Sequence, residues 1–210
     1  MTRILLVDDY PVVLEGLRYI LAEAIVDVEF GVASGAADAV RLFRSAKWHV
    51  VVLDVSLPDG SGLDVLKQMR AIRPQTPILV LSMYPEDQFA VRLLRAGAAG
   101  YLTKKALARE LVTAVLRVRA GGKYVSPALA ERLADELRAG TAKAPHEALS
   151  DREYLVFRML GSGKTVKQIA QELGLSPQTV STHRTRLLEK MGMKSNADLV
   201  RYSSDHRLLG

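Results

Sequence analysis

Short apolar runs alternate with stretches of helical period over the first 123 residues. The runs are ILLV at 4–7, VDVEFGVA at 26–33, VVVL at 50–53, PILVL at 77–81 and AGYLT at 99–103. Between and after them, apolar residues recur every three or four positions, as at Leu14, Leu17 and Leu21, which is the spacing of one helix face. Buried strands that alternate with amphipathic helices are typical of an α/β fold with a doubly wound parallel sheet. We therefore predict five βα units.

The rest of the chain is predicted to be helical. Gly121 and Gly122 end the fifth helix, and SPALAERLADELRAG begins a connector helix with Ser126 as its cap. The small, polar and Pro-containing stretch AGTAKAPHEA at 139–148 is typical of a flexible linker. The predicted domains are residues 1–123, a connector helix with its linker at 124–148, and a small all-α domain at 149–210.

Composition narrows the class of protein. The chain has no cysteine, so disulfides and thiolate metal sites are excluded. The apolar run before the first acidic pair is only ILLV, which is too short for the core of a signal peptide, and no apolar run is long enough for a membrane span. We expect a cytoplasmic protein that does not enter the membrane. Residues 150–210 hold ten Lys or Arg against six Asp or Glu, so this part is a candidate for binding a polyanion.

Four of the five predicted strands end in side chains that carry chemistry. Asp8 and Asp9 follow the first strand, Asp54 the third, Ser82 the fourth and Lys104 the fifth. Each residue alone is an ordinary loop or cap residue, but the carboxyl ends of parallel strands share one edge of a sheet. Crowded carboxylates need a cation to offset their repulsion, and oxygen ligands without His or Cys favour Mg²⁺. A carboxylate in such a site can accept a phosphoryl group, and Asp54 on the central strand is the candidate.

The segments LLVDDYP, VVLDVSLPDGSGLDVL, ILVLSMY and AGAAGYLTK, spread over residues 3–123, resemble the receiver domain of two-component response regulators. The resemblance implies a flavodoxin-like five-stranded parallel sheet of order 2-1-3-4-5. It also implies that Asp54 takes a phosphoryl group from a sensor histidine kinase.

Further residue roles are implied by the same resemblance. The ligands of Mg²⁺ would be oxygen atoms of Asp8, Asp9, Asp54 and the backbone carbonyl of Ser56. Ser82 and Lys104 would bind the phosphoryl oxygens, and Tyr101 would swing inward as an aromatic switch.

Two residues depart from the pattern of this family. Tyr10 stands where DNA-binding members often have His, and Lys105 follows Lys104 where many receivers have Pro, which leaves open whether that peptide bond is cis. A phosphatase of the haloacid-dehalogenase type, which also forms an aspartyl phosphate, is an alternative. The general acid of such enzymes lies two residues after the nucleophile, where Ser56 cannot donate a proton near neutral pH.

The sequence GSGKT at 161–165 looks like the end of a nucleotide-binding loop. Such a loop needs another glycine at the position of Arg158 and a buried strand before it, whereas the preceding stretch has helical spacing. Thr165 and Gln168 instead form a capping box for a helix that ends at Gly174. With the helix that follows, this pattern predicts a helix-turn-helix. A nucleotide hydrolase that uses 161–165 is kept as an alternative.

Residues 149–200 resemble the four-helix DNA-binding domain of the LuxR/NarL type, so the chain as a whole is similar to NarL/FixJ response regulators. The resemblance makes 165–173 the scaffold helix, 176–191 the recognition helix and 195 onward a helix often used for dimerisation. Hydroxyl side chains would contact bases from Ser181, Thr182 and Thr185. Basic side chains would meet phosphates from Lys164, Lys167, His183, Arg184, Arg186 and Lys190.

The resulting hypothesis is a phosphorylation-controlled DNA-binding transcription regulator rather than an enzyme. Phosphorylation of Asp54 would favour a homodimer that binds two half-sites of double-stranded promoter DNA. Two further alternatives stay open at this point. One is a regulator that acts without phosphate, and the other is a helical interaction module whose polar face binds no DNA.

Overall fold

The computed structural model describes residues 1–84, 86–139, 145–206 and 208. The chain divides into two units, Met1–Gly140 and Thr141–Gly210. The first unit contains the connector helix as well as the five βα units. Residues 140–144, the middle of the predicted linker, lie outside the described residues.

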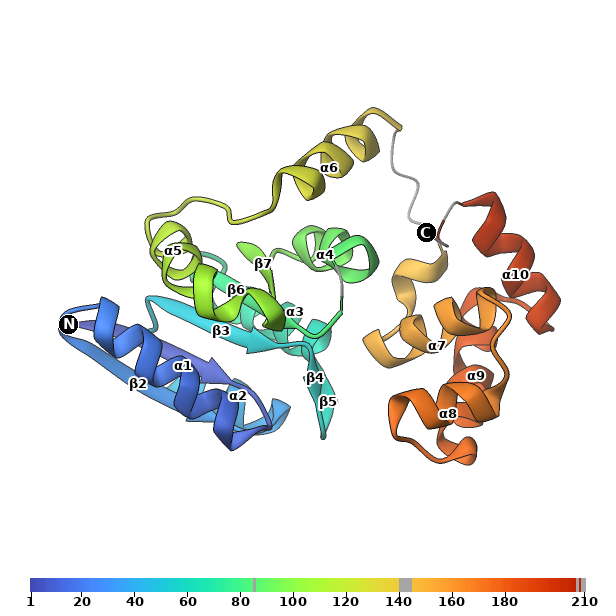
Figure 1. Cartoon of the computed structure of the whole chain (residues 1–210), viewed down its shortest axis with the longest axis horizontal. Coiled ribbons are helices and arrows are strands. Elements are labelled where there is room, and N and C mark those ends of the chain that lie inside the picture. Colours follow the sequence, from blue (N-terminus) through green and yellow to red (C-terminus); the bar gives the residue numbers. More distant parts are fainter. Residues whose placement is uncertain (85, 140–144, 207, 209–210) are drawn as a thin grey trace. The chain divides into compact units, whose positions relative to one another are not determined.

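The first unit is built on a parallel sheet. Its strands are β1 Thr2–Val7, β2 Val28–Ala33, β3 Val50–Asp54, β6 Ile78–Ser82 and β7 Gly100–Thr103. Their order is β2-β1-β3-β6-β7 and every neighbouring pair is parallel (Figure 1). Counted over these five strands alone, this is the predicted order 2-1-3-4-5, which is thereby confirmed.

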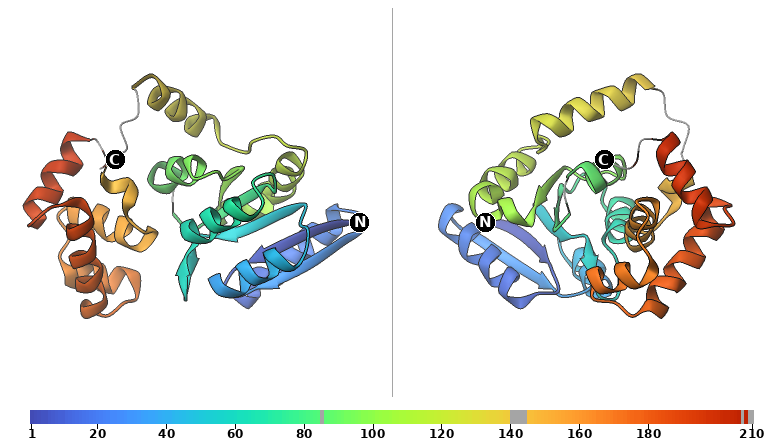
Figure 2. Two further views of the ribbon diagram at one scale, coloured as in Figure 1. Left: turned by 180° about the vertical axis from the view of Figure 1, so that it is seen from behind. Right: turned by 45° about the vertical axis from the view of Figure 1, so that its right-hand side comes forward.

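Helices cover both faces of this sheet, as the predicted α/β fold requires (Figure 2). They are α1 Pro11–Ala24, α2 Ala36–Ser45, α3 Gly62–Ile72, α4 Glu86–Arg95 and α5 Leu107–Arg119. Helices α1 and α5 pack together on one face and α2 and α3 on the other, while α4 packs beside β7. After α5 comes the connector helix α6 Pro127–Ala139. Ser126 caps it, because its Oγ accepts a hydrogen bond from the Leu129 N–H at 3.2 Å.

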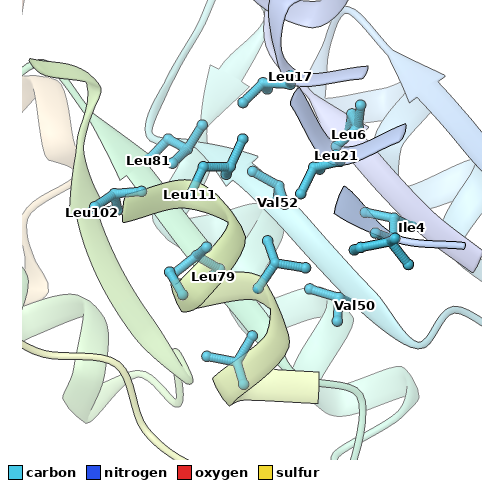
Figure 3. Close-up of a cluster of buried hydrophobic side chains, with 14 of the residues drawn as sticks. Ile4, Leu6, Leu17, Leu21, Val50, Val52, Leu79, Leu81, Leu102 and Leu111 are labelled. Carbon is cyan, nitrogen blue, oxygen red and sulfur yellow. The ribbon is translucent and has the colours of Figure 1, made fainter. Parts of the chain in front are cut away.

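Successive apolar side chains along each strand point to opposite faces of the sheet, so the hydrophobic core has one part on each face. Figure 3 shows the cluster in which Ile4, Leu6 and Val52 from the strands meet Leu17 and Leu111 from α1 and α5. The residues between them on the strands point to the opposite face and are equally buried. Because burying each large aliphatic side chain contributes about 1.5–3 kcal/mol, these two clusters hold the strand ends in place.

The strand bounds differ from the prediction in ways that have physical causes. Strand β2 begins at Val28 rather than at Val26, because Asp27 has a left-handed φ of 58°. The Asp27 carboxylate pairs with the N-terminal ammonium at 2.7 Å, and its carbonyl accepts from the Thr2 N–H. A short hairpin of β4 Ser56–Leu57 and β5 Gly60–Ser61 follows β3 and was not predicted.

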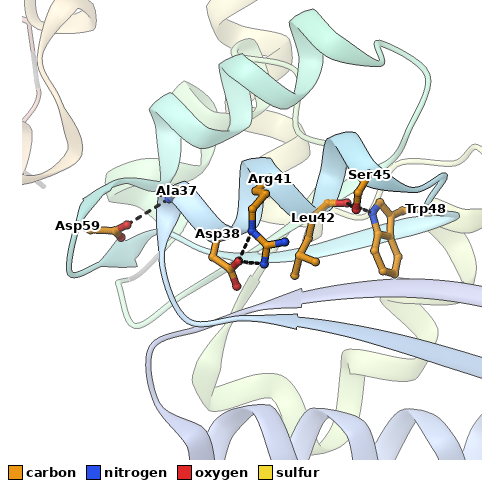
Figure 4. Close-up of polar contacts among 7 residues, drawn as sticks. All are labelled: Ala37, Asp38, Arg41, Leu42, Ser45, Trp48 and Asp59. Atoms are coloured by element: carbon orange, nitrogen blue, oxygen red, sulfur yellow. Dashed lines mark hydrogen bonds and ion pairs between the residues drawn. The ribbon is translucent and has the colours of Figure 1, made fainter.

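The turn of this hairpin is tied to the start of α2. The Asp59 carboxylate accepts a hydrogen bond from the Ala36 N–H at 2.6 Å. It accepts a second one from the Ala37 N–H at 3.1 Å, which is drawn in Figure 4. These bonds lower the pKa of Asp59. A carboxylate at a helix N-terminus also interacts favourably with the helix dipole. Asp59 therefore anchors the loop that directly follows Asp54.

The second unit is helical. It consists of a short 3₁₀ helix η2 Pro145–Ala148, α7 Asp151–Gly161, α8 Val166–Leu173, α9 Pro177–Met191 and α10 Asn196–Asp205. The predicted capping box is present, since Thr165 Oγ1 accepts from the Gln168 N–H and Gln168 Oε1 accepts from the Thr165 N–H. Gly174 ends α8 with a φ of 65°, as the left-handed cap requires. None of the described helices is both long and apolar enough to span a lipid bilayer.

The end of the predicted linker is ordered. His146 in η2 places its Nδ1 at 2.9 Å from the hydroxyl of Tyr202 in α10, and its ring stacks on Phe157 of α7. Leu149, just after η2, is buried. Residues 145–148 therefore belong to the helical unit and do not continue the linker.

Candidate functional site

The carboxyl ends of the strands gather the predicted acidic residues. Asp8 follows β1, Asp54 ends β3, and both are almost fully buried. Each of Asp8, Asp9 and Asp54 has a carboxylate oxygen within 4.8 Å of those of the other two. Ser82 ends β6 and is also buried. The sheet thus brings together residues that are up to 74 positions apart in the sequence.

Lys104 supplies the positive charge of this pocket. It follows β7 and begins the 3₁₀ helix η1 Lys104–Ala106. Its Nζ lies 2.6 Å from Asp8 Oδ2 and 2.9 Å from Asp54 Oδ2, and its side chain is only 9% exposed. Burial would lower the pKa of Lys104, but hydrogen bonds to Asp54 and Asp8 raise it above its usual value. The ammonium is therefore charged at neutral pH.

Burial has the opposite effect on the central carboxylate. It raises the pKa of Asp54 from 3.8 to about 6, although the hydrogen bond and charge of Lys104 pull it back down. Asp54 Oδ1 also accepts a hydrogen bond from the Ser56 N–H at 3.3 Å. At neutral pH the carboxylate is ionised and held in a fixed orientation, which suits a nucleophile.

A chain of backbone and hydroxyl groups joins Ser82 to Tyr101. The Tyr84 N–H donates to Ser82 Oγ at 3.0 Å, and the Tyr101 hydroxyl donates to the Tyr84 carbonyl at 2.7 Å. Tyr101 has no exposed surface, so the predicted switch aromatic already lies inside. The role of Tyr84 could not be predicted from the sequence, because its hydrogen bonds are made by backbone atoms.

The structure shows the surroundings of Tyr10 and Lys105, the two residues that depart from the family pattern. The Tyr10 ring lies 5.6 Å from Lys104 Nζ, within the range of a cation–π contact. Its N–H donates to Asp8 Oδ1 at 3.0 Å, while its side chain stays exposed. No peptide bond among the described residues is cis, so the bond before Lys105 is trans.

The pocket fits a hard divalent cation. Lys104 offers one positive charge against three carboxylates that lie within 4.8 Å of one another. Asp9 Oδ1 is buried and accepts no hydrogen bond from the described residues. Oxygen donors alone, one of them without a partner, are the ligands that hard cations prefer. This acidic cluster could therefore bind a metal ion.

The second candidate site is the outer face of α9. Val180, Leu187, Leu188 and Met191 of this helix are buried, as predicted. Ser181, Thr182, Thr185 and Arg186 are exposed. The Thr182 hydroxyl donates to the Gln178 carbonyl at 3.0 Å and the Thr185 hydroxyl to that of Ser181 at 3.1 Å. Because each hydroxyl already donates its proton to a backbone carbonyl, its oxygen is left as a hydrogen-bond acceptor. Such an oxygen can accept hydrogen bonds from the amino groups of adenine or cytosine.

Several of the predicted phosphate-binding side chains already have partners. Lys164 Nζ lies 2.6 Å from Glu172 and Lys190 Nζ lies 2.6 Å from the buried Glu153. Arg184 Nε donates to Asn196 Oδ1 at 2.7 Å. Burial lowers the pKa of His183, so this ring is neutral at pH 7. Among the predicted phosphate-binding residues, Lys167 and Arg186 are exposed and make no salt bridge within the described part of the chain.

The resemblance of 161–165 to a nucleotide loop has a structural explanation. Gly163 has a φ of 86° in the turn between α7 and α8. Thr165 uses its side chain to cap α8, and Lys164 pairs with an acidic residue of the same helix. The stretch is a helix cap and not a phosphate cradle.

Comparison with known proteins agrees with this geometry. Residues 4–116 match the model of the response regulator receiver domain, and residues 147–203 match that of bacterial regulatory proteins, luxR family. The chain is 34% identical over 210 residues to the response regulator GacA of Pseudomonas aeruginosa, covering all of this chain and 98% of the relative. This chain belongs to the response regulators.

Solved structures support the same assignment. RcsB from Salmonella enterica serovar Typhimurium, bound to promoter rprA in the presence of the phosphomimetic BeF₃⁻, is 25% identical with a TM-score of 0.57. That match covers 97% of this chain and 98% of RcsB. A structure of two RcsB dimers bound to two parallel DNAs matches with a TM-score of 0.59, at the same identity and coverage.

As a response regulator with a LuxR-type domain, the protein is a DNA-binding transcription regulator and not an enzyme. The phosphatase and nucleotide-hydrolase alternatives are therefore discarded. The interaction module without DNA binding is discarded for the same reason.

Proposed function

We propose that Asp54 is the phosphoacceptor of this regulator. The observation that carries the proposal is the buried Asp54 carboxylate, fixed at the edge of the sheet by Lys104 at 2.9 Å and by the Ser56 N–H. A carboxylate oxygen of Asp54 attacks the phosphorus of a kinase phosphohistidine. As the new P–O bond forms, the P–N bond breaks, and the imidazole nitrogen keeps the electron pair and takes up a proton.

The neighbouring side chains bind the phosphoryl oxygens. Lys104 offers an ammonium that can move from the carboxylates to the new phosphoryl group, and the Ser82 hydroxyl offers a neutral donor. Asp8, Asp9, Asp54 and the Ser56 carbonyl would hold Mg²⁺. When bound, the ion supplies positive charge that offsets the charge of the phosphoryl oxygens. Tyr101 reports the state of the pocket through Tyr84.

We further propose that phosphorylation favours a homodimer on promoter DNA, as two RcsB dimers bind DNA in their solved structure. The recognition helix α9 would read bases through Ser181, Thr182 and Thr185. Lys167 and Arg186 would make the main phosphate contacts. Lys164, His183, Arg184 and Lys190 would have to exchange protein partners for phosphate, or contribute no charge. Since the partners are a sensor kinase and promoter DNA, the cytoplasm is the proposed compartment.

The proposed division of labour follows the predicted domains. Residues 1–123 would receive the phosphoryl group, 149–210 would bind DNA, and 124–148 would connect them, although the end of this segment, 145–148, packs with the helical unit. This division separates the chemistry of phosphorylation from the reading of sequence.

Labelling with acetyl phosphate and Mg²⁺ tests the phosphoacceptor. We expect wild-type protein to become phosphorylated and Asp54→Asn to take no label, because the amide is not a nucleophile. The matched control is Asp64→Asn, which changes an exposed carboxylate on α3 and should label as well as the wild type. Undiminished labelling of Asp54→Asn would reject the site.

The same preparations test the dependence of DNA binding on phosphate. Phosphorylated wild type should bind its promoter fragments more tightly than Asp54→Asn treated in the same way. Equal oligomeric state and equal affinity with and without acetyl phosphate would favour the phosphate-independent regulator.

A further inference from the structure

Residues 123–129, here called the edge clasp, lie along the open side of strand β7. The Tyr101 N–H donates to the Tyr124 carbonyl at 3.0 Å, and the Tyr124 N–H donates to the Ala99 carbonyl at 3.0 Å. This is a parallel bridge between Gly100 and Tyr124. Lys123 adds a hydrogen bond from its Nζ to the Ala98 carbonyl at 3.2 Å. The clasp thus covers backbone groups that an edge strand would leave unpaired.

Gly100 makes this close approach feasible. A Cβ at position 100 would lie 2.6 Å from the Tyr124 carbonyl oxygen and 2.8 Å from its Cβ. Such distances are far below van der Waals contact, and the first of them involves backbone. Any larger residue at 100 must therefore push the clasp away from β7.

Side chains fasten the clasp to the helices on either side of β7. The Tyr124 hydroxyl donates to Glu110 of α5 at 2.7 Å, and the Ser126 hydroxyl donates to Glu86 of α4. Leu129, in the first turn of α6, is only 1% exposed. Beside it lies a hollow of about 450 Å³, lined in part by Leu102, Glu110 and Arg132. Helix α6 therefore starts from a point fixed to three elements of the first unit.

The strand that holds the clasp also carries groups of the phosphoacceptor pocket. Tyr101 bonds the clasp through its N–H and bonds Tyr84 through its hydroxyl, and Tyr84 in turn bonds Ser82. Lys104 directly follows the same strand and holds both Asp8 and Asp54. A phosphoryl group that takes over Lys104 and the Ser82 hydroxyl changes what fixes the end of β7.

We propose that the edge clasp is a releasable attachment of the connector helix, which phosphorylation of Asp54 loosens. This inference rests on the proposed function of Asp54. Two backbone hydrogen bonds at a sheet edge tolerate only small displacements of the strand, since hydrogen bonds weaken steeply with poor geometry. When the end of β7 shifts, the clasp loses them, and α6 with the chain beyond it gains freedom to rearrange for DNA binding.

Hydrogen–deuterium exchange on the full chain tests the proposal, with Mg²⁺ and beryllofluoride as the phosphoryl mimic. Without the mimic, peptides that contain 123–129 should exchange slowly. With it, we expect exchange there to become about tenfold faster, the effect of losing one or two hydrogen bonds. Amides at 54–56 and 82–84 should become better protected in the same sample.

Gly100→Ala tests the clasp directly, because the added methyl group should push residues 123–129 away from β7 and leave the side chains of the phosphoacceptor pocket unchanged. This variant should show fast exchange at 123–129 even without the mimic, and should still be labelled by acetyl phosphate. The matched control is Gly16→Ala, where a Cβ meets nothing within 4 Å and exchange at 123–129 should stay slow. If Gly100→Ala fails to fold, Tyr124→Phe, which loses only the bond to Glu110, should show a smaller increase.

The outcomes separate the two proposals. Better protection at 54–56 and 82–84 with unchanged exchange at 123–129 would overturn the clasp and leave the phosphoacceptor in place. No response of the pocket amides to the mimic would reject the proposed function of Asp54, and the clasp with it.

Discussion

The acidic pocket and the outer face of α9 represent two different ways to build a functional surface. In the pocket, Asp8, Asp54 and Lys104 come from three strand ends and are buried against one another. On α9, Thr182 and Arg186 come from one helix and point to solvent. The first surface depends on the whole sheet, whereas the second depends on a single helix held by its apolar side.

This difference determines how each surface responds to substitution. A buried charge that loses its partner is costly, because water cannot replace the partner. An exposed charge is already solvated, so its loss changes binding and leaves folding almost unaffected. Substitutions in the pocket should therefore alter stability and chemistry together, and substitutions on the exposed face of α9 should alter DNA binding alone.

Lys104→Met should have the largest effect. It leaves Asp8 and Asp54 buried without their ammonium, so the free energy of unfolding at pH 7 in EDTA should fall by about 3–5 kcal/mol. Urea denaturation measures this change. Lys105→Met, at the exposed neighbouring position, is the control and should change stability little. A loss below about 1 kcal/mol for Lys104→Met would show that the pocket tolerates unpaired charge and behaves like the helix surface.

Asp54→Asn should raise the free energy of unfolding, whereas Lys104→Met lowers it. The pKa of Asp54 is about 6 in the folded chain and 3.8 as the ordinary value, so between these pH values the folded state holds the proton more tightly. Ionisation of Asp54 therefore destabilises the fold progressively as the pH rises from about 4 to 6, and the full cost is present at pH 7.

The asparagine variant removes that cost. In EDTA it should be more stable than the wild type by about 1–3 kcal/mol at pH 7 and nearly equal to it at pH 4. Urea denaturation at the two pH values checks the prediction, with Asp64→Asn as an exposed control. A variant that is less stable than the wild type at pH 7 would mean that the bond to Lys104 outweighs the burial of Asp54.

The sequence predicted the pocket better than the DNA-binding surface, for physical reasons. Strand order and the shared carboxyl edge follow from apolar runs and parallel topology, so the convergence of Asp8, Asp54 and Lys104 could be expected. The pairing of Lys190 with Glu153 could not, because it depends on how α9 lies against α7. Nor could the bridge made by Tyr84, since backbone groups carry no sequence signal.

The same limit applies to the fold. Capping boxes such as Thr165 with Gln168 are local and were visible in the sequence. The left-handed Asp27 pairs with the N-terminus, and the hairpin after Asp54 is tied through Asp59 to the start of α2, so both involve contacts between distant segments of the chain. The first shifts the start of β2 and the second adds a short hairpin, and neither alters the order of the sheet.

Substitutions of Lys190 and Arg186 should change stability less than the pocket variants do. The two residues are cations on the same helix, but only Lys190 is paired with a buried carboxylate. Lys190 pairs with the buried Glu153, whose pKa is lowered through its bonds to Lys190 and Ser150 despite its burial. Lys190→Ala should therefore lower the free energy of unfolding of the helical unit by about 1–2 kcal/mol. The loss should shrink as the pH falls and Glu153 takes up its proton.

Arg186→Ala should show the reverse pattern. Its side chain is exposed, so stability should stay within about 0.5 kcal/mol of the wild type. Affinity for every DNA sequence should fall by about fivefold, and the slope of log affinity against log salt concentration should become shallower by about one, as expected for one lost phosphate contact. Fluorescence anisotropy at several salt concentrations measures both quantities. If Lys190→Ala flattened the salt dependence as much as Arg186→Ala does, its ammonium would have to leave Glu153 for phosphate on binding, and ion pairing in the unbound protein would be a poor guide to contact with DNA.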